Sequence, residues 1–232
     1  AGTSLKFYVF EGNQANDITP IRSSNNAVTF AATNGSNIIT ATDTSHGAVL
    51  NDFVTFSGAA SLGGQITAAV LNREYQIYEI VDANSYKFVA TATANSSDTG
   101  NSGASSKAAY QINTGLDSAA FGAGWGAGVW GRGTWNSAAN VTIPAASLRL
   151  WSQDNFGEDL IMNVRNGGIF YWDKSGGVGA RAVALSTLGG AQAAPTVAAI
   201  VLVSEKDRHV IAFGCDPESA SGTQDPLTIR FS

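Results

Sequence analysis

The most constraining feature of the sequence is residues 149–173, where three short runs of strand-forming residues follow one another. A polar corner at Gly157 separates the first two runs, and a second corner at Asn166-Gly167-Gly168 precedes an aromatic run. Strand-formers that flank glycine-containing corners are typical of consecutive antiparallel strands. The segment therefore predicts one piece of sheet folded back on itself, and nothing in it looks like an enzyme's active site.

A second sheet is predicted near the end of the sequence. Residues 197–204, 209–214 and 227–231 indicate three strands, with a charged turn at residues 205–208. Each sheet, at roughly 40 to 45 residues, has the length of a β-propeller blade. Because a propeller needs at least about four blades, the others would lie in neighbouring chains or in further sequence. A plain two-sheet sandwich is the alternative.

The first half of the chain predicts a hairpin and a small β-domain. Residues 5–10 and 17–22 indicate the hairpin, and residues 27–113 contain short β-rich runs between tight turns, as in a small β-barrel or sandwich. Residues 66–72 favour one or two turns of helix, and residues 96–106 are typical of an exposed loop. The expected strands of the small domain lie at residues 28–30, 38–42, 53–56, 75–80 and 86–90. The sequence therefore predicts an all-β protein of antiparallel sheets.

Charge and hydropathy limit the function classes. The 13 basic and 18 acidic residues give a net charge of −5, and the basic residues are scattered singly. Tight nucleic-acid binding needs a concentrated cationic face, so DNA is expected at most to pass nearby. Charged residues make up only 13% of the chain, as in proteins built into assemblies. No apolar run approaches the roughly 20 residues of a membrane span.

Both ends of the chain look cut. The sequence starts at Ala1 without a methionine and stops at Ser232, directly after a strand-like run. We therefore expect a fragment of a longer polypeptide.

The residues that usually carry catalysis or bind metals are few. The chain has two histidines, His46 and His209, and a single cysteine, Cys215. We expect His46 to be a hydrogen-bonded turn residue, His209 to take an edge or cross-strand position, and Cys215 to be a small buried hydrophobe. This composition argues against a zinc site and excludes an internal disulfide. No cofactor is expected.

Three acidic residues near one corner are the strongest candidates for hydrolysis. Asp154, Glu158 and Asp159 lie within six residues of one another, and paired carboxylates can act as acid and base or bind calcium. However, the spacing of an EF-hand is absent. Solvated corner carboxylates are the preferred interpretation, and no enzymatic activity is expected.

Three tryptophans form the clearest candidate binding site. Trp125, Trp130 and Trp135 follow one another at steps of five in a glycine-rich segment. Aromatic faces stack on sugar rings, so these residues indicate a sugar-binding platform. The other interpretation, which we favour, is that the indoles fill gaps between neighbouring elements or subunits.

Taken in order, several segments resemble the tail-tube nozzle proteins of tailed bacteriophages. The similarity is spread over most of the chain and is carried by structural motifs. The matching segments are residues 5–10, 17–22, 46–47, 52–58, 124–126, 151–159, 169–173, 207–210 and 225–232.

The resemblance implies a propeller-like structural protein of the virion. Proteins of this family form homo-oligomeric rings, commonly hexamers, next to other tail proteins such as the adaptor, and the genome leaves through their lumen. By resemblance, residues 1–26 plus 115–232 form an incomplete propeller-like body, and residues 27–114 form an inserted small β-domain. Family members are usually several times longer than this chain, which implies that a closed propeller is not contained in it.

Overall fold

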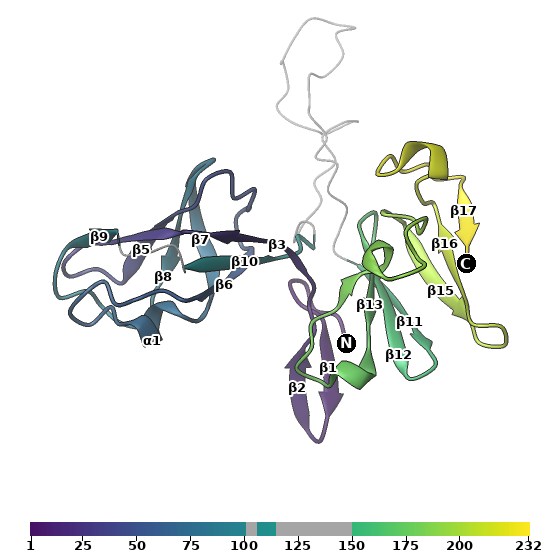
Figure 1. Ribbon diagram of the computed structural model, residues 1–232, viewed down its shortest axis with the longest axis horizontal. Coiled ribbons are helices and arrows are strands. Elements are labelled where there is room, and N and C mark those ends of the chain that lie inside the picture. Colours follow the sequence, from purple (N-terminus) through teal and green to yellow (C-terminus); the bar gives the residue numbers. More distant parts are fainter. Residues whose placement is uncertain (101–105, 115–149) are drawn as a thin grey trace, which may run out of the picture. The chain divides into compact units, whose positions relative to one another are not determined.

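The computed structural model describes residues 1–100, 106–114 and 150–232, which form two compact units (Figure 1). The body unit consists of residues 1–18 and 114–232, and the small unit consists of residues 19–113. All strand pairings are antiparallel, so the predicted all-β class is confirmed. Over the described part of the chain, no helix has the length and hydropathy needed to cross a membrane.

The small unit is built on one sheet of eight strands in the order β3-β10-β6-β7-β8-β5-β4-β9. The strands are β3 (Ile21–Asn26), β4 (Thr29–Ala32), β5 (Ile38–Thr42), β6 (Phe53–Ser57), β7 (Glu74–Asp82), β8 (Ser85–Val89), β9 (Asp98–Gly100) and β10 (Lys107–Gln111). The long strand β7 joins the two halves, because its beginning pairs with β6 and its end pairs with β8. Register shifts after Ile77 and Ile80 interrupt the second pairing, and such irregularities bend a strand.

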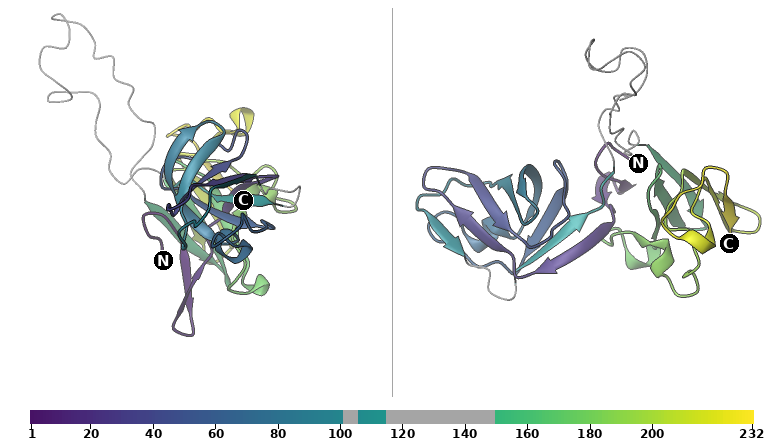
Figure 2. Two further views of the ribbon diagram at one scale, coloured as in Figure 1. Left: turned by 90° about the vertical axis from the view of Figure 1, so that its left-hand side faces the viewer. Right: turned by 90° about the horizontal axis from the view of Figure 1, so that it is seen from above.

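The bend allows the two halves of this sheet to pack face to face, and Figure 2 shows the folded sheet in two further views. Phe30 of β4 meets Phe56 of β6 edge to face, with ring centroids 5.0 Å apart, although these strands are not neighbours in the sheet. Phe88 of β8 lies 5.1 Å from Phe56. The edge strands β3 and β9 are not paired with each other in the described residues. The small unit is therefore a sandwich rather than a closed barrel.

The five strands expected in the small unit are present, and three further strands were not predicted. Strand β9 lies within the segment expected to be a loop, while β3 and β10 pair with each other. These strands are rich in small and polar residues, which pair through backbone groups that every sequence has. The predicted helical turns are confirmed as α1 (Ala68–Leu71), which Thr67 caps by accepting a hydrogen bond from the amide of Val70.

The body unit contains three layers of β-structure. The first is the hairpin of β1 (Tyr8–Glu11) and β2 (Gln14–Asp17), the second is the sheet β11-β12-β13-β14, and the third is the sheet β15-β16-β17. The strands of the two sheets are β11 (Trp151–Phe156), β12 (Asp159–Val164), β13 (Ile169–Trp172), β14 (Val183–Ala184), β15 (Ile200–Ser204), β16 (His209–Phe213) and β17 (Ile229–Phe231). Short 3-10 turns lie at Lys174–Gly176, Leu185–Thr187 and Glu218–Ala220. Both predicted sheets are confirmed.

The opening hairpin is tighter than the sequence suggested. Its turn consists of Gly12 and Asn13, with φ values of 56° and 64°, and this left-handed geometry favours two-residue hairpin loops. The turn sets Glu11 opposite Gln14. The prediction that residues 17–22 form the partner strand was therefore wrong.

The three layers of the body unit stack face to face (Figure 1). Phe7, which precedes β1, packs on Trp151 of β11 with ring centroids 4.9 Å apart. On its other face, the middle sheet contributes Ile161 and Ile169 to a core that also contains Val201 of β15. Sheets stacked in this way resemble neighbouring propeller blades as well as a sandwich.

Candidate functional site

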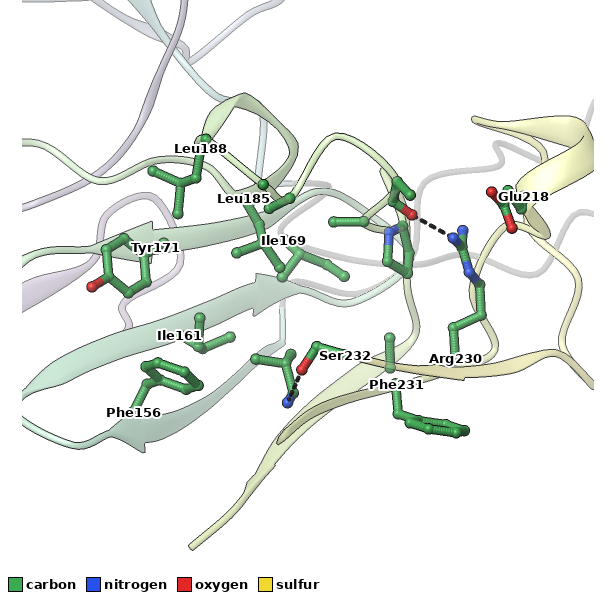
Figure 3. A pocket seen from close by; sticks show the side chains of 18 of the residues that line it. Phe156, Ile161, Ile169, Tyr171, Leu185, Leu188, Glu218, Arg230, Phe231 and Ser232 are labelled. Carbon is green, nitrogen blue, oxygen red and sulfur yellow. Dashed lines mark hydrogen bonds between the residues drawn. The ribbon is translucent and has the colours of Figure 1, made fainter. Parts of the chain in front are cut away.

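A cavity of about 890 Å³ lies between the second and third layers of the body unit (Figure 3). Its walls are mostly apolar, and Ile161 and Tyr171 from the middle sheet line it together with Leu185 and Leu188 from the segment that follows β14. Among the described residues, the charged side chains that line it are Arg230 and Glu218. A cavity of this size and polarity is a candidate binding site.

The Arg230 side chain holds the wall of the cavity in place. Its guanidinium donates to the backbone oxygen of Asp216 at 3.2 Å and to that of Ala193. These bonds attach the segment before β15 to the last strand. Backbone acceptors thus engage the cation, and Glu218 is exposed to solvent.

A buried carboxylate organises the loops beside this cavity. Asp216 is 1% exposed, and it accepts hydrogen bonds from the amides of Thr196 and Gly222 at 2.9 and 2.7 Å and from the Thr196 hydroxyl at 2.7 Å. Burial alone would raise the pKa of Asp216, but hydrogen bonds from Thr196, Gly222 and Val197 outweigh it and lower the pKa below its ordinary value of 3.8. Asp216 is thus an ionised anchor for two loops, a role that was not predicted from the sequence.

The three corner carboxylates serve the fold in different ways. Asp154 accepts a hydrogen bond from the amide of Val203 at 2.8 Å, which joins β11 to the edge of β15. Asp159 accepts from the hydroxyl of Tyr171 and the amide of Lys174. Glu158 is 81% exposed at its side chain. Only Glu158 therefore fits the predicted solvated corner, because the two aspartates satisfy donors that the sheets leave free.

Replacing Asp154 by alanine is expected to loosen the edge of β15. The amide of Val203 loses its acceptor, so its hydrogen exchange should accelerate about tenfold, which corresponds to about 1.4 kcal/mol. Glu158→Ala is the matched control and should leave the exchange of this amide unchanged. Equal protection in Asp154→Ala and the parent would show that the carboxylate does not support β15.

The contact between Asp159 and Tyr171 makes the stability of the body unit depend on pH in the alkaline range. The hydrogen bond to Asp159, followed by burial, raises the pKa of Tyr171 to about 12 from 10.0. Because the folded pKa exceeds the unfolded value, this stabilisation is complete below pH 10 and is lost as the pH rises towards 12. Asp159→Asn should return the pKa of Tyr171 towards 10 in a tyrosinate absorbance titration, with Tyr171→Phe used to assign the signal. An unchanged titration in Asp159→Asn would contradict this assignment.

His46 is confirmed as a hydrogen-bonded turn residue. Its Nδ1 accepts from the amide of Ala48 at 3.0 Å, and its Nε2 lies 3.1 Å from the backbone oxygen of Asp82. The ring is 3% exposed and packs edge to face on Tyr86. With Nδ1 as the acceptor, Nε2 carries the proton that faces Asp82, so His46 belongs to the core of the small unit.

A buried acid beside His46 is also satisfied within the fold. Asp43 is 5% exposed and accepts hydrogen bonds from Tyr110 and from the amide group of Asn25. The Tyr110 and Tyr86 hydroxyl oxygens are 2.9 Å apart. The pKa of both tyrosines lies far above the usual range, mainly because their hydroxyls are buried. This network is a polar part of the core with each of these groups paired.

The remaining predicted residues have structural positions or lie outside the described residues. Cys215 is fully buried, as predicted, and burial raises the pKa of its thiol. His209 begins β16, and its Nδ1 contacts the backbone oxygen of Ser232. No group of three or more residues suited to hold a metal ion occurs within the described ranges. The predicted tryptophan platform lies outside them: its members are Trp125, Trp130 and Trp135.

The third layer exposes an apolar face that was not predicted from the sequence. In β15–β17, Ile200 lies opposite Phe213 and Leu202 opposite Ile211, and these two β16 residues lie opposite Ile229 and Phe231 of β17. Residues directly opposite in antiparallel strands share a face, so these six side chains form one surface. We call this surface the outer face, because Val201, Val203 and Ala212 point the other way into the core. Its six members are Ile200, Leu202, Ile211, Phe213, Ile229 and Phe231.

The outer face is open to solvent. The exposed fractions are 51% for Ile200, 58% for Ile229 and 77% for Phe231. Figure 3 shows the ring of Phe231 turned away from the cavity. An apolar surface of this kind is typical of an interaction site.

Comparison with known proteins yields a structural likeness of low similarity. No protein-family model and no curated protein sequence matches the chain. Among solved structures, the chain is similar to the phage phi92 endosialidase at 12% identity and a TM-score of 0.35. The similarity covers 84% of this chain and 28% of the endosialidase chain. This chain thus spans little more than a quarter of that protein, and the similarity is too low to show a shared fold.

Proposed function

We propose that this protein is a non-enzymatic structural component of a bacteriophage tail, of the nozzle or tubular type. The observation that carries the proposal is the stack of three β-layers in the body unit, whose carboxylates bind strands and loops. Asp154 supports β15, Asp159 holds Tyr171, and Asp216 anchors two loops. Acidic groups engaged in this way are suited to rigidity, and the sequence resemblance to tail nozzle proteins points to the same role.

The charge of the chain suits a conduit for DNA. A net charge of −5 with scattered cations gives a surface that repels phosphates weakly and offers few counter-charges to bind them. A genome can then move past the protein without being held. In this proposal the subunits form a closed ring, a hexamer by family resemblance, between the adaptor and the end of the tail.

The location in the virion is directly testable. Antibodies raised against the whole protein should label the tail of intact phage particles and leave the capsid unlabelled in electron micrographs. Detection of the protein only in infected-cell lysates, with none in purified particles, would contradict a virion role.

The sequence pattern of tryptophans supports one alternative, a carbohydrate-binding module. Trp125, Trp130 and Trp135 would stack on sugar rings through their aromatic faces. In a glycan array, Trp130→Ala should then abolish binding, while Trp130→Phe, which keeps an aromatic face, should retain part of it. Absence of glycan binding by the parent protein would eliminate this alternative.

A further inference from the structure

The outer face of the β15–β17 sheet has the properties of a contact between two copies of this chain. We propose that two copies pack these faces against each other about a two-fold axis. This inference does not depend on the proposed tail function, because a two-fold contact differs from the head-to-tail contacts that close a ring.

The size of the outer face fits such a contact. The exposed fractions of Ile200, Ile229 and Phe231 lie between 51% and 77%, and Leu202 adds 37%. With about 200 Å² for a fully exposed large side chain, the six members expose roughly 500 Å² per copy. Two copies then bury about 1,000 Å², the area at which specific interfaces begin.

The charges around the outer face also favour pairing of identical chains. None of its six members is ionisable, and the residues at the end of the same hairpin are Glu205, Lys206, Asp207 and Arg208. These four charges alternate in sign and sum to zero. Two such surfaces therefore approach without the like-charge repulsion that a net charge of −5 would otherwise create.

Packing by faces is favoured over pairing by edges. Strand β17 is an edge strand of only three residues, so joining two β17 strands would add few hydrogen bonds, each with a small net gain in water. Edge pairing would also leave the six apolar side chains in water. Burial of apolar area is the dominant driving force for association, and face-to-face packing achieves it with the two sheets aligned within about 30°.

The first test measures self-association by sedimentation equilibrium of the whole chain. At micromolar concentration the smallest associated species of the parent should be a dimer joined by this face, and Leu202→Glu and Ile229→Glu should each weaken this pairing about 100-fold, because a carboxylate would be desolvated in the contact. Val183→Glu, at a side chain 45% exposed on β14, is the matched control and should dimerise like the parent. Unchanged circular dichroism should accompany all three substitutions, because the replaced side chains face solvent.

The second test locates the two-fold axis. Ile211 lies on the central strand of the face, so Ile211→Cys places two thiols close together, and mild oxidation should give a disulfide-linked dimer. The native thiol of Cys215 is fully buried and should not react. Val183→Cys, which places an exposed thiol on β14, is the control and should give no disulfide-linked dimer. A monomeric parent, a dimer that survives both glutamate substitutions, or equal cross-linking of Ile211→Cys and Val183→Cys would overturn the proposal and assign the outer face to a different partner.

Discussion

Replacement of Asp216 by alanine is expected to destabilise the body unit by about 3–5 kcal/mol, because several buried donors lose their acceptor at once. The amides of Thr196 and Gly222, which lie 2.9 and 2.7 Å from its oxygens, come from loops on either side of β15 and β16. Without the carboxylate, both loops lose their shared attachment. Calorimetry should show a fall of about 10 °C in the melting temperature of the body unit.

The stabilisation that Asp216 provides should also depend on pH in the acidic range. Its folded pKa lies below the ordinary value of 3.8, so its stabilisation is present above pH 3.8 and is lost as the pH falls through the folded pKa. The difference between the parent and Asp216→Ala should therefore shrink in that window. Asp207→Ala, at an exposed turn residue, should change the stability by less than about 0.5 kcal/mol. A similar loss in both variants would show that the buried carboxylate has no special role.

Replacement of Phe56 by alanine is expected to destabilise the small unit by about 3–5 kcal/mol, since a large buried ring is lost and a cavity remains. Phe56 is 1% exposed and packs on Phe30 and Phe88, which come from the other half of the folded sheet. Its loss weakens the contact that holds the two halves together. In a unit of this size, the melting temperature should fall by about 12 °C or more.

The control for Phe56 is an exposed aromatic residue on the same sheet. Tyr78 lies on β7 and is 56% exposed, so Tyr78→Ala should change the stability of the small unit by less than about 0.5 kcal/mol. Equal melting temperatures for Phe56→Ala and Tyr78→Ala would contradict a face-to-face sandwich with Phe56 at its centre.

Strands with strong alternation were predictable from the sequence. Strands β5, β6 and β8 alternate apolar residues that face the core with partly exposed ones, and tight turns mark their ends. Strands β3 and β9 were missed because Ser23, Ser24 and their neighbours carry no apolar period. Their pairing depends on backbone groups that a neighbouring strand supplies, which a local pattern does not reveal.

The roles of the acidic residues were not predictable from their spacing. Asp154 and Asp159 flank one turn, but their hydrogen-bond donors include Val203 and Tyr171, which lie on other strands. Asp216 has donors on both sides in sequence, 20 residues before it and 6 after it. Such partners are brought together only by the tertiary fold.

The outer face left a signal in the sequence. Apolar residues recur at every second position of β15, β16 and β17, and the four-residue turn between β15 and β16 fixes Ser204 opposite His209. With that register, Leu202 and Ile211 fall on one face. Because the intervening positions are also apolar in β15, the same run is also typical of a strand buried on both faces. The structure shows instead that one of its faces is exposed.

The most direct test of the central claim, that this chain is a structural subunit of a tail conduit, is electron microscopy of the purified protein together with native mass measurement. The claim predicts closed rings of identical subunits, six by family resemblance, with an axial channel. Monomers or simple pairs at every concentration and ionic strength, with no closed ring, would contradict it.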